Sequence, residues 1–213
     1  MRPRLFLITP REDLSDRLTG LVAAALSGGD VASLLIDIEA ISAGNRQTIV
    51  KSLVQICHEA DVAALIRNDT QLTGRCGADG VHVDSGLADL DSIVDTFRPG
   101  KIVGAGQVTN RHNALLVGDM DVDYVFFGPL DRPEDESADP TSIALAEWWS
   151  PMIEIPCIAM AGNSDMSVAQ ACETGAEFVG LRAYAWNDPA GPADAIRKAN
   201  EILDGFADDS ADE

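Results

Sequence analysis

Lysine is scarce in this chain of 213 residues, which contains only Lys51, Lys101 and Lys198. All basic side chains together number 15 against 35 acidic ones, which gives a formal net charge of -20. Such a field repels nucleic acids and anionic membrane surfaces, so we expect neither as a partner. The run of acids at residues 207–213 predicts a disordered tail after a single domain of residues 1–206.

Paired cysteines and long apolar runs are also absent. The four cysteines form no C-x-x-C pair and show no zinc-ligand spacing, so we interpret them as reduced, structural side chains. Near the N-terminus only residues 5–8 are apolar in a row, which is too few for a signal peptide or a membrane-spanning helix. These absences predict a cytoplasmic protein. A homo-oligomer with a contact through Trp148 or Trp149 stays open.

The chain does contain a regular alternation of short apolar runs and helical patterns. Eight runs are expected to form strands, at residues 5–8, 32–36, 62–66, 80–83, 102–105, 122–127, 155–161 and 178–181. A helical pattern follows each run, and the first helix is predicted to begin at once, with Thr9 as N-cap, Pro10 next and Glu12 reaching back. Because the strands are apolar on both faces, the units predict an α/β fold of the (β/α)8 TIM-barrel type.

A doubly wound open sheet is the main alternative, since it is built from the same strand-helix units. That fold would normally bring a Gly-rich phosphate-binding turn after its first strand. This chain has Thr-Pro-Arg-Glu at residues 9–12 instead. The barrel is therefore favoured.

Functional groups of such a barrel lie at the carboxyl ends of its strands and in the loops that follow. The polar candidates at these positions are Asn68, Asp69, His82, Asp84 and Arg182. His82 alternates with apolar neighbours, so we expect it to point into the barrel. Blander readings stay open: Asn68 and Asp69 as a helix N-cap pair, His82 as a hydrogen-bonded interior histidine, and Arg182 as the partner of an acidic loop.

Six segments, in their order along the chain, resemble the thiamine phosphate synthase family. They are LFLIT at 5–9, ND at 68–69, GADGVH at 77–82, DYVFFGP at 123–129, IPCIAMAG at 155–162 and GAEFV at 175–179. The resemblance implies a TIM barrel that joins a hydroxymethylpyrimidine pyrophosphate to a thiazole phosphate. Pyrophosphate leaves with the help of Mg2+, and the thiazole nitrogen captures the resulting cation.

The same resemblance assigns the pyrophosphate end of the pocket. It implies that Asn68 contacts the pyrophosphate and that Asp69 binds Mg2+. Asp84 and Asp89 are imperfect substitutes for the second ligand of the metal. His82 and Gly128 would line the pocket next to them. The expected cofactor is therefore Mg2+.

The phosphate of the thiazole is assigned to the last two strands. The resemblance implies that it rests on backbone N–H groups around Gly162 and after the eighth strand, near Arg182 and Ala183. The expected partner is thus a small phosphorylated ligand.

Several positions depart from the family pattern. The Gln, Arg and Lys of the family's second strand are matched here to Leu34, Ile36 and Ile38, its Ser in the fifth strand to Gly106, and its lysine-bearing loop to the acidic residues 130–139. Losing one donor to a developing negative charge typically slows a reaction roughly 100- to 1,000-fold. We therefore expect a thiamine phosphate synthase of low efficiency. The alternative is a non-catalytic barrel that binds a thiazole phosphate or another small phosphate ligand.

Overall fold

Eight parallel strands close into a barrel in the computed structural model, which describes residues 2–208. Each strand pairs with its neighbour in sequence, and β8 pairs with β1. The strands are β1 Arg4–Ile8, β2 Ser33–Ile36, β3 Ala63–Arg67, β4 Gly80–Val83, β5 Ile102–Ala105, β6 Tyr124–Phe127, β7 Cys157–Met160 and β8 Phe178–Leu181. The predicted (β/α)8 barrel is confirmed.

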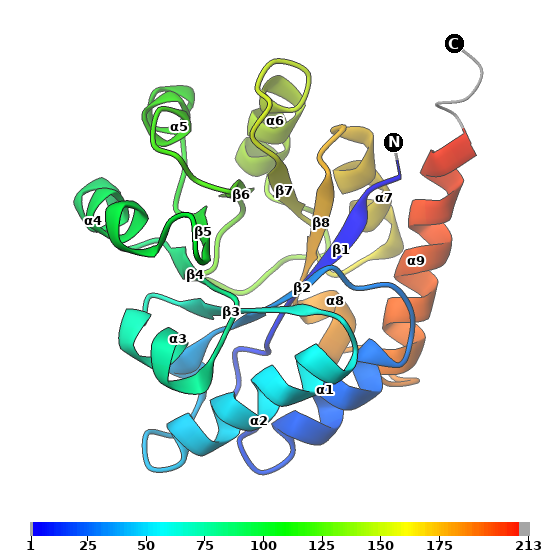
Figure 1. Cartoon of the computed structure of the whole chain (residues 1–213). Helices are drawn as coiled ribbons and strands as arrows, with labels where there is room; N and C mark the ends of the chain where they lie inside the picture. The colour runs from blue at the N-terminus through cyan, green and yellow to red at the C-terminus, as the bar shows by residue number, and fades with distance from the viewer. Residues whose placement is uncertain (1, 209–213) are drawn as a thin grey trace.

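Helices surround the barrel on its outside (Figure 1). They are α1 Leu18–Leu26, the 3-10 turn η1 Ile38–Ala40, α2 Arg46–Glu59, α3 Thr70–Cys76, α4 Leu87–Phe97, α5 Arg111–Gly118, α6 Pro140–Trp149, α7 Asp165–Glu173, α8 Ala183–Trp186 and α9 Pro192–Asp208. None of the helices within residues 2–208 is long and apolar enough to cross a membrane. Of the predicted tail at 207–213, residues 207 and 208 end α9, and the rest lies outside the described residues.

Two apolar cores follow from the alternation of side chains along the strands. A small core fills the barrel interior, where Phe6, Leu35, Leu65, Phe126 and Met160 are buried together. A larger core lies between the outer face of the strands and the helices. Because successive strand residues point to opposite sides, a single strand contributes side chains to both cores.

The first helix begins later than its sequence pattern predicts. It starts at Leu18, so the prediction of Thr9 as its N-cap is wrong. The Thr9 hydroxyl instead accepts a hydrogen bond of 2.9 Å from the backbone N–H of Asp37, which follows β2. A good cap residue thus joins the ends of two neighbouring strands, and residues 9–17 form a loop at the barrel mouth.

Candidate functional site

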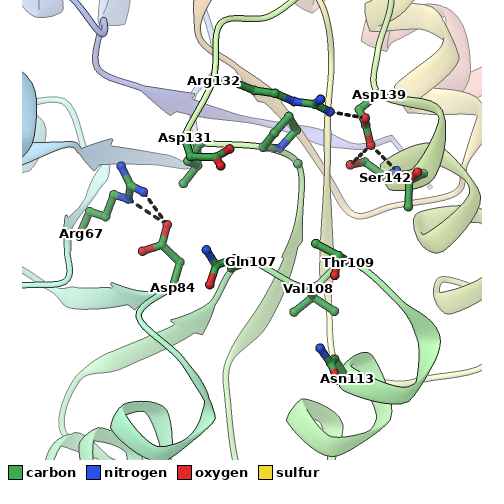
Figure 2. A pocket seen from close by; sticks show the side chains of 14 residues that line it. Arg67, Asp84, Gln107, Val108, Thr109, Asn113, Asp131, Arg132, Asp139 and Ser142 are labelled. Carbon is green, nitrogen blue, oxygen red and sulfur yellow. Dashed lines mark hydrogen bonds and ion pairs between the residues drawn. The ribbon is translucent and has the colours of Figure 1, made fainter.

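The carboxyl ends of β3 to β6 and the loops after them surround a cavity of about 630 Å³. Figure 2 shows Arg67 and Asp84 on one side of it and Arg132, Asp139 and Ser142 on the other. This cavity lies at the end of the barrel where the sequence placed the candidate residues.

Arg67 is the last residue of β3 and lies buried between two carboxylates. Its Nε donates to Asp84 Oδ2 at 2.9 Å, and its Nη1 donates to Asp37 Oδ2 at 2.9 Å. Burial opposes the charge of the guanidinium, but the hydrogen bonds and charges of the two carboxylates outweigh it and raise the pKa of Arg67. The site therefore holds a permanent cation that the protein's own acids already neutralise.

The inner face of β2 ends in an acidic residue, Asp37, which directly follows the strand. Leu34 and Ile36 pack in the outer core, whereas Leu35 faces the barrel interior and Asp37, two residues on, reaches Arg67. The prediction that Leu34, Ile36 and Ile38 line the pocket is wrong, because it took the strand one residue out of register and so exchanged its two faces.

Asn68 and Asp84 hold each other at the ends of β3 and β4. Asn68 adopts a left-handed backbone conformation with φ of 54°, and its Oδ1 accepts a hydrogen bond of 2.9 Å from the Asp84 N–H. The Asn68 amide also donates to the Asp84 carboxylate. Burial disfavours the Asp84 charge, but Arg67 above all, with Asn68 among other neighbours, outweighs it and lowers the pKa of Asp84. Asp84 is thus kept ionised in the pocket.

Asp69 serves as the N-cap of α3, where its Oδ1 accepts a hydrogen bond of 2.7 Å from the Leu72 N–H. The cap role that the sequence left open is therefore present. Within residues 2–208, His, Cys, Asp and Glu side chains form no group of three or more that could hold a metal ion. Mg2+ often binds through one or two carboxylates plus substrate phosphates. Of the two carboxylates that the resemblance assigns to the metal, Asp84 lines the large cavity, and Asp69 is not among its lining residues.

His82 is completely buried inside the barrel beside Tyr124 and Phe126. Its Nδ1 lies 2.9 Å from the Tyr124 hydroxyl oxygen, and its Nε2 has no hydrogen-bond partner in the described part of the chain. Burial lowers the pKa of His82 from 6.5 to about 4, so the ring is neutral at pH 7. A Cβ at Gly106 would lie 2.4 Å from Nε2, so glycine is needed there for the observed ring position.

Arg182 follows β8 and is bound by the loop between β6 and α6. Its Nε donates to Glu134 Oε1 at 2.5 Å, and its Nη1 and Nη2 donate to the carbonyl oxygens of Leu130 and Arg132 at 3.0 and 2.9 Å. Of the two partners that the sequence left open for Arg182, the structure contains the acidic loop. A small cavity of about 140 Å³ is lined by Arg182, Glu134 and Ala183.

Gly128 and Gly162 are placed where backbones pack closely. Gly128 lines the large cavity, and a Cβ on it would meet the Met160 side chain at 2.3 Å. Gly162 lies under the β6–α6 loop, where a Cβ would come within 2.5 Å of the Ser137 carbonyl oxygen. Both glycines thus keep the mouth of the barrel tightly packed.

Three functional candidates were missed by the sequence reasoning: Arg67, Asp37 and Glu134. Arg67 ends an apolar strand two residues after Leu65, which faces the interior, so alternation could have found it. Asp37 could have been found in the same way from Leu35. Glu134 is one of several acids in a loop, and no periodicity marks the one that is buried.

The fold and these cavities define the class of the protein: a (β/α)8 barrel with two polar cavities at the carboxyl ends of its strands, each lined by a buried, acid-paired arginine. Binding sites of such barrels lie at this end.

The chain belongs to the thiamine monophosphate synthase family, whose model matches residues 5–183. Thiamine-phosphate synthase of Hyphomonas neptunium is 32% identical, with 97% of this chain and 96% of the relative covered. That of Rhodospirillum centenum is also 32% identical, over 95% of this chain and 98% of the relative. Thiamine phosphate pyrophosphorylase from Pyrococcus furiosus shares the fold with a TM-score of 0.80 at 19% identity, over 96% of this chain and 97% of that one.

Proposed function

We propose that the protein makes thiamine phosphate from a hydroxymethylpyrimidine pyrophosphate and a thiazole phosphate, at a low rate. Relatives named thiamine-phosphate synthase match nearly its whole length. The observation that carries the proposal is a polar cavity of about 630 Å³ at the carboxyl end of this family's barrel. We propose a cytoplasmic location and a small phosphorylated ligand as the partner.

In this reaction the C–O bond to the pyrophosphate breaks, and pyrophosphate leaves with the bonding electrons. The thiazole nitrogen then donates its lone pair to the carbocation, and a C–N bond forms. Asp69 and Asp84 would hold Mg2+, which supplies positive charge to the leaving group when bound. Arg67 acts as a positioning residue, because it fixes Asp84 Oδ2 and keeps that carboxylate ionised.

The low rate follows from the charges at the mouth. Arg67 is bound by Asp37 and Asp84, and Arg182 is bound by Glu134. Each would have to leave a carboxylate before it could stabilise a departing pyrophosphate. Since one lost donor costs roughly 100- to 1,000-fold in rate, we expect the neutralisation of the two arginines to slow turnover.

The same pairing favours a second candidate function, a non-catalytic barrel that binds a thiazole phosphate or another small phosphate ligand. This function needs affinity for one phosphate and no stabilisation of a leaving group. It differs from the first in its product, because binding alone leaves both substrates intact.

Incubation of the purified protein with both substrates and Mg2+, followed by measurement of thiamine phosphate, tests the proposal. We expect slow product formation that Asp84→Asn reduces further. Absence of product, together with a thermal shift on adding thiazole phosphate, would replace the proposal with the binding function. Absence of both would contradict both functions.

A further inference from the structure

The β6–α6 loop, residues 128–139, lies directly on the ends of β7 and β8. The Asn163 N–H donates to the Asp135 carbonyl oxygen at 2.8 Å, and the Ser164 hydroxyl donates to the Glu136 carbonyl oxygen at 2.7 Å. Gly162 has no side chain, and this permits the close approach of Ser137. The loop backbone therefore covers the polar groups that follow β7.

Glu134 occupies the centre of this contact. Its side chain is 6% exposed and that of Arg182 is 1% exposed, so the ion pair is withdrawn from water. Arg182 also donates to three carbonyl oxygens of the loop, those of Pro129, Leu130 and Arg132. Every guanidinium nitrogen is thus used by the loop.

The Glu134–Arg182 ion pair lies at the end of the barrel where phosphate is often bound. Phosphate sites of (β/α)8 barrels are frequently formed by the loops after strands seven and eight, and Arg182 directly follows β8. Arginine binds carboxylates and phosphates with the same fork of N–H donors. The Glu134 carboxylate therefore has the charge and the partner that a phosphate would have there.

We infer that Glu134 is an internal competitor for the phosphate of the ligand, and that the β6–α6 loop must leave Arg182 before a phosphorylated ligand binds. The identity of that ligand rests on the proposed function, whereas the competition does not. Only the fraction of molecules with the loop released binds, and the apparent dissociation constant rises as that fraction falls.

The composition of the loop suits it to be displaced. Residues 131–133 and 135–137 are exposed, so Glu134 is the buried contact in the middle of an otherwise solvated segment. Leu130 and Ala138 are buried at either end and retain the loop on the barrel. Five acids lie in the loop, and an incoming phosphate repels all of them: Asp131, Glu134, Asp135, Glu136 and Asp139. Occupation of Arg182 by phosphate therefore favours release of the loop.

Calorimetric titration with inorganic phosphate and with thiazole phosphate tests the inference on wild type, Glu134→Gln and Glu136→Gln. The two variants remove the same charge from the same loop, but Glu136 is exposed. We expect Glu134→Gln to bind both probes at least ~10-fold more tightly than wild type, and Glu136→Gln to stay within about twofold. Equal affinities for the two variants, or weaker binding by Glu134→Gln, would overturn the inference.

A second measurement needs no variant and is decisive if Glu134→Gln fails to fold. Glutamyl endopeptidase cuts after Glu134 and Glu136, so its rate reports the position of the loop in wild type. We expect phosphate or thiazole phosphate to speed this cleavage. A loop that closes over the ligand would slow it, and slower or unchanged cleavage would contradict the inference.

Neither measurement depends on turnover. If wild type makes no thiamine phosphate but Glu134→Gln gains affinity for phosphate, the proposed function fails and the competition stands. If wild type makes thiamine phosphate and Glu134→Gln gains nothing, the competition fails and the function stands.

Discussion

Two buried arginines at the mouth of the barrel, Arg67 and Arg182, differ in what holds them. Arg67 is bound by Asp37 and Asp84, which directly follow β2 and β4, the two strands that flank β3. Arg182 is bound by Glu134, which belongs to a largely exposed loop. The ion pairs of Arg67 are therefore held by residues next to the barrel strands, whereas movement of a loop can break the ion pair of Arg182.

The buried ion pairs of Arg67 and Arg182 therefore have different consequences for the site. Around Arg67 the ion pairs orient Asp84 and keep it ionised. Around Arg182 the ion pair occupies the arginine itself. Fixed acids thus build one end of the site, and a movable acid covers the other.

Replacement of Arg67 is expected to have the largest effect on stability. Arg67→Met leaves the buried carboxylates of Asp37 and Asp84 without their cation. Breaking a buried ion pair from one side typically costs about 3–5 kcal/mol. Urea denaturation should show this loss in the free energy of unfolding, and a loss below about 1 kcal/mol would refute the structural role of the pair.

Arg182→Met should cost less, about 2 kcal/mol, because Glu134 can move into water with its loop. We also expect faster cleavage of residues 128–139 by glutamyl endopeptidase under native conditions. If Arg182→Met proved as costly as Arg67→Met, with no change in cleavage, the loop would be as fixed as the strand ends.

Acid is expected to lower the free energy of unfolding, because His82 is buried in a neutral form. Burial lowers its pKa to about 4 in the folded protein, against 6.5 when exposed, so the unfolded chain binds more protons between these values. Stability is therefore present above pH 6.5 and is lost as the pH falls toward 4. We expect about 1.2 kcal/mol of loss from this group between pH 7 and pH 5.5.

The pH dependence of His82→Asn checks this assignment, because the variant lacks the titrating ring whatever its absolute stability. Its free energy of unfolding should be flatter than that of wild type between pH 7 and 5.5. The same slope in both proteins would show that another group titrates.

Arg197 gives the smallest expected effect and serves as a control for both arginines. Like Arg67 it has two acidic partners, Asp194 and Glu201, but its side chain is 51% exposed on α9. Exposed ion pairs contribute little because water and salt screen them. Arg197→Met should leave the urea midpoint within experimental error, and a clear drop would mean that burial is not what distinguishes Arg67.

The sequence predicted the barrel because alternating units and short apolar runs are local features. It also placed Asn68, Asp69 and Asp84 directly after the correct strands, and it predicted that His82 points into the barrel. It failed at Thr9, where a good cap residue bonds to Asp37 across the barrel mouth, because capping signals carry no information on long-range partners.

The acidic residues that bind the two arginines could be identified only from the structure. A register error of one residue along β2 replaced the inner face, which ends in Asp37, with the apolar outer face. The partner of Arg182 depended on the path of a twelve-residue loop, 128–139, whose acids are equivalent in sequence but not in burial. Pairings between distant segments are therefore what the sequence pattern left undetermined.

The value of kcat/KM for thiamine phosphate formation, measured beside a relative that keeps Gln, Arg and Lys on its second strand, tests most directly whether self-neutralised arginines limit this site. We predict a value at least ~100-fold below that of the relative, as expected when donors to the leaving pyrophosphate are withheld. A value within about tenfold of the relative would contradict the account.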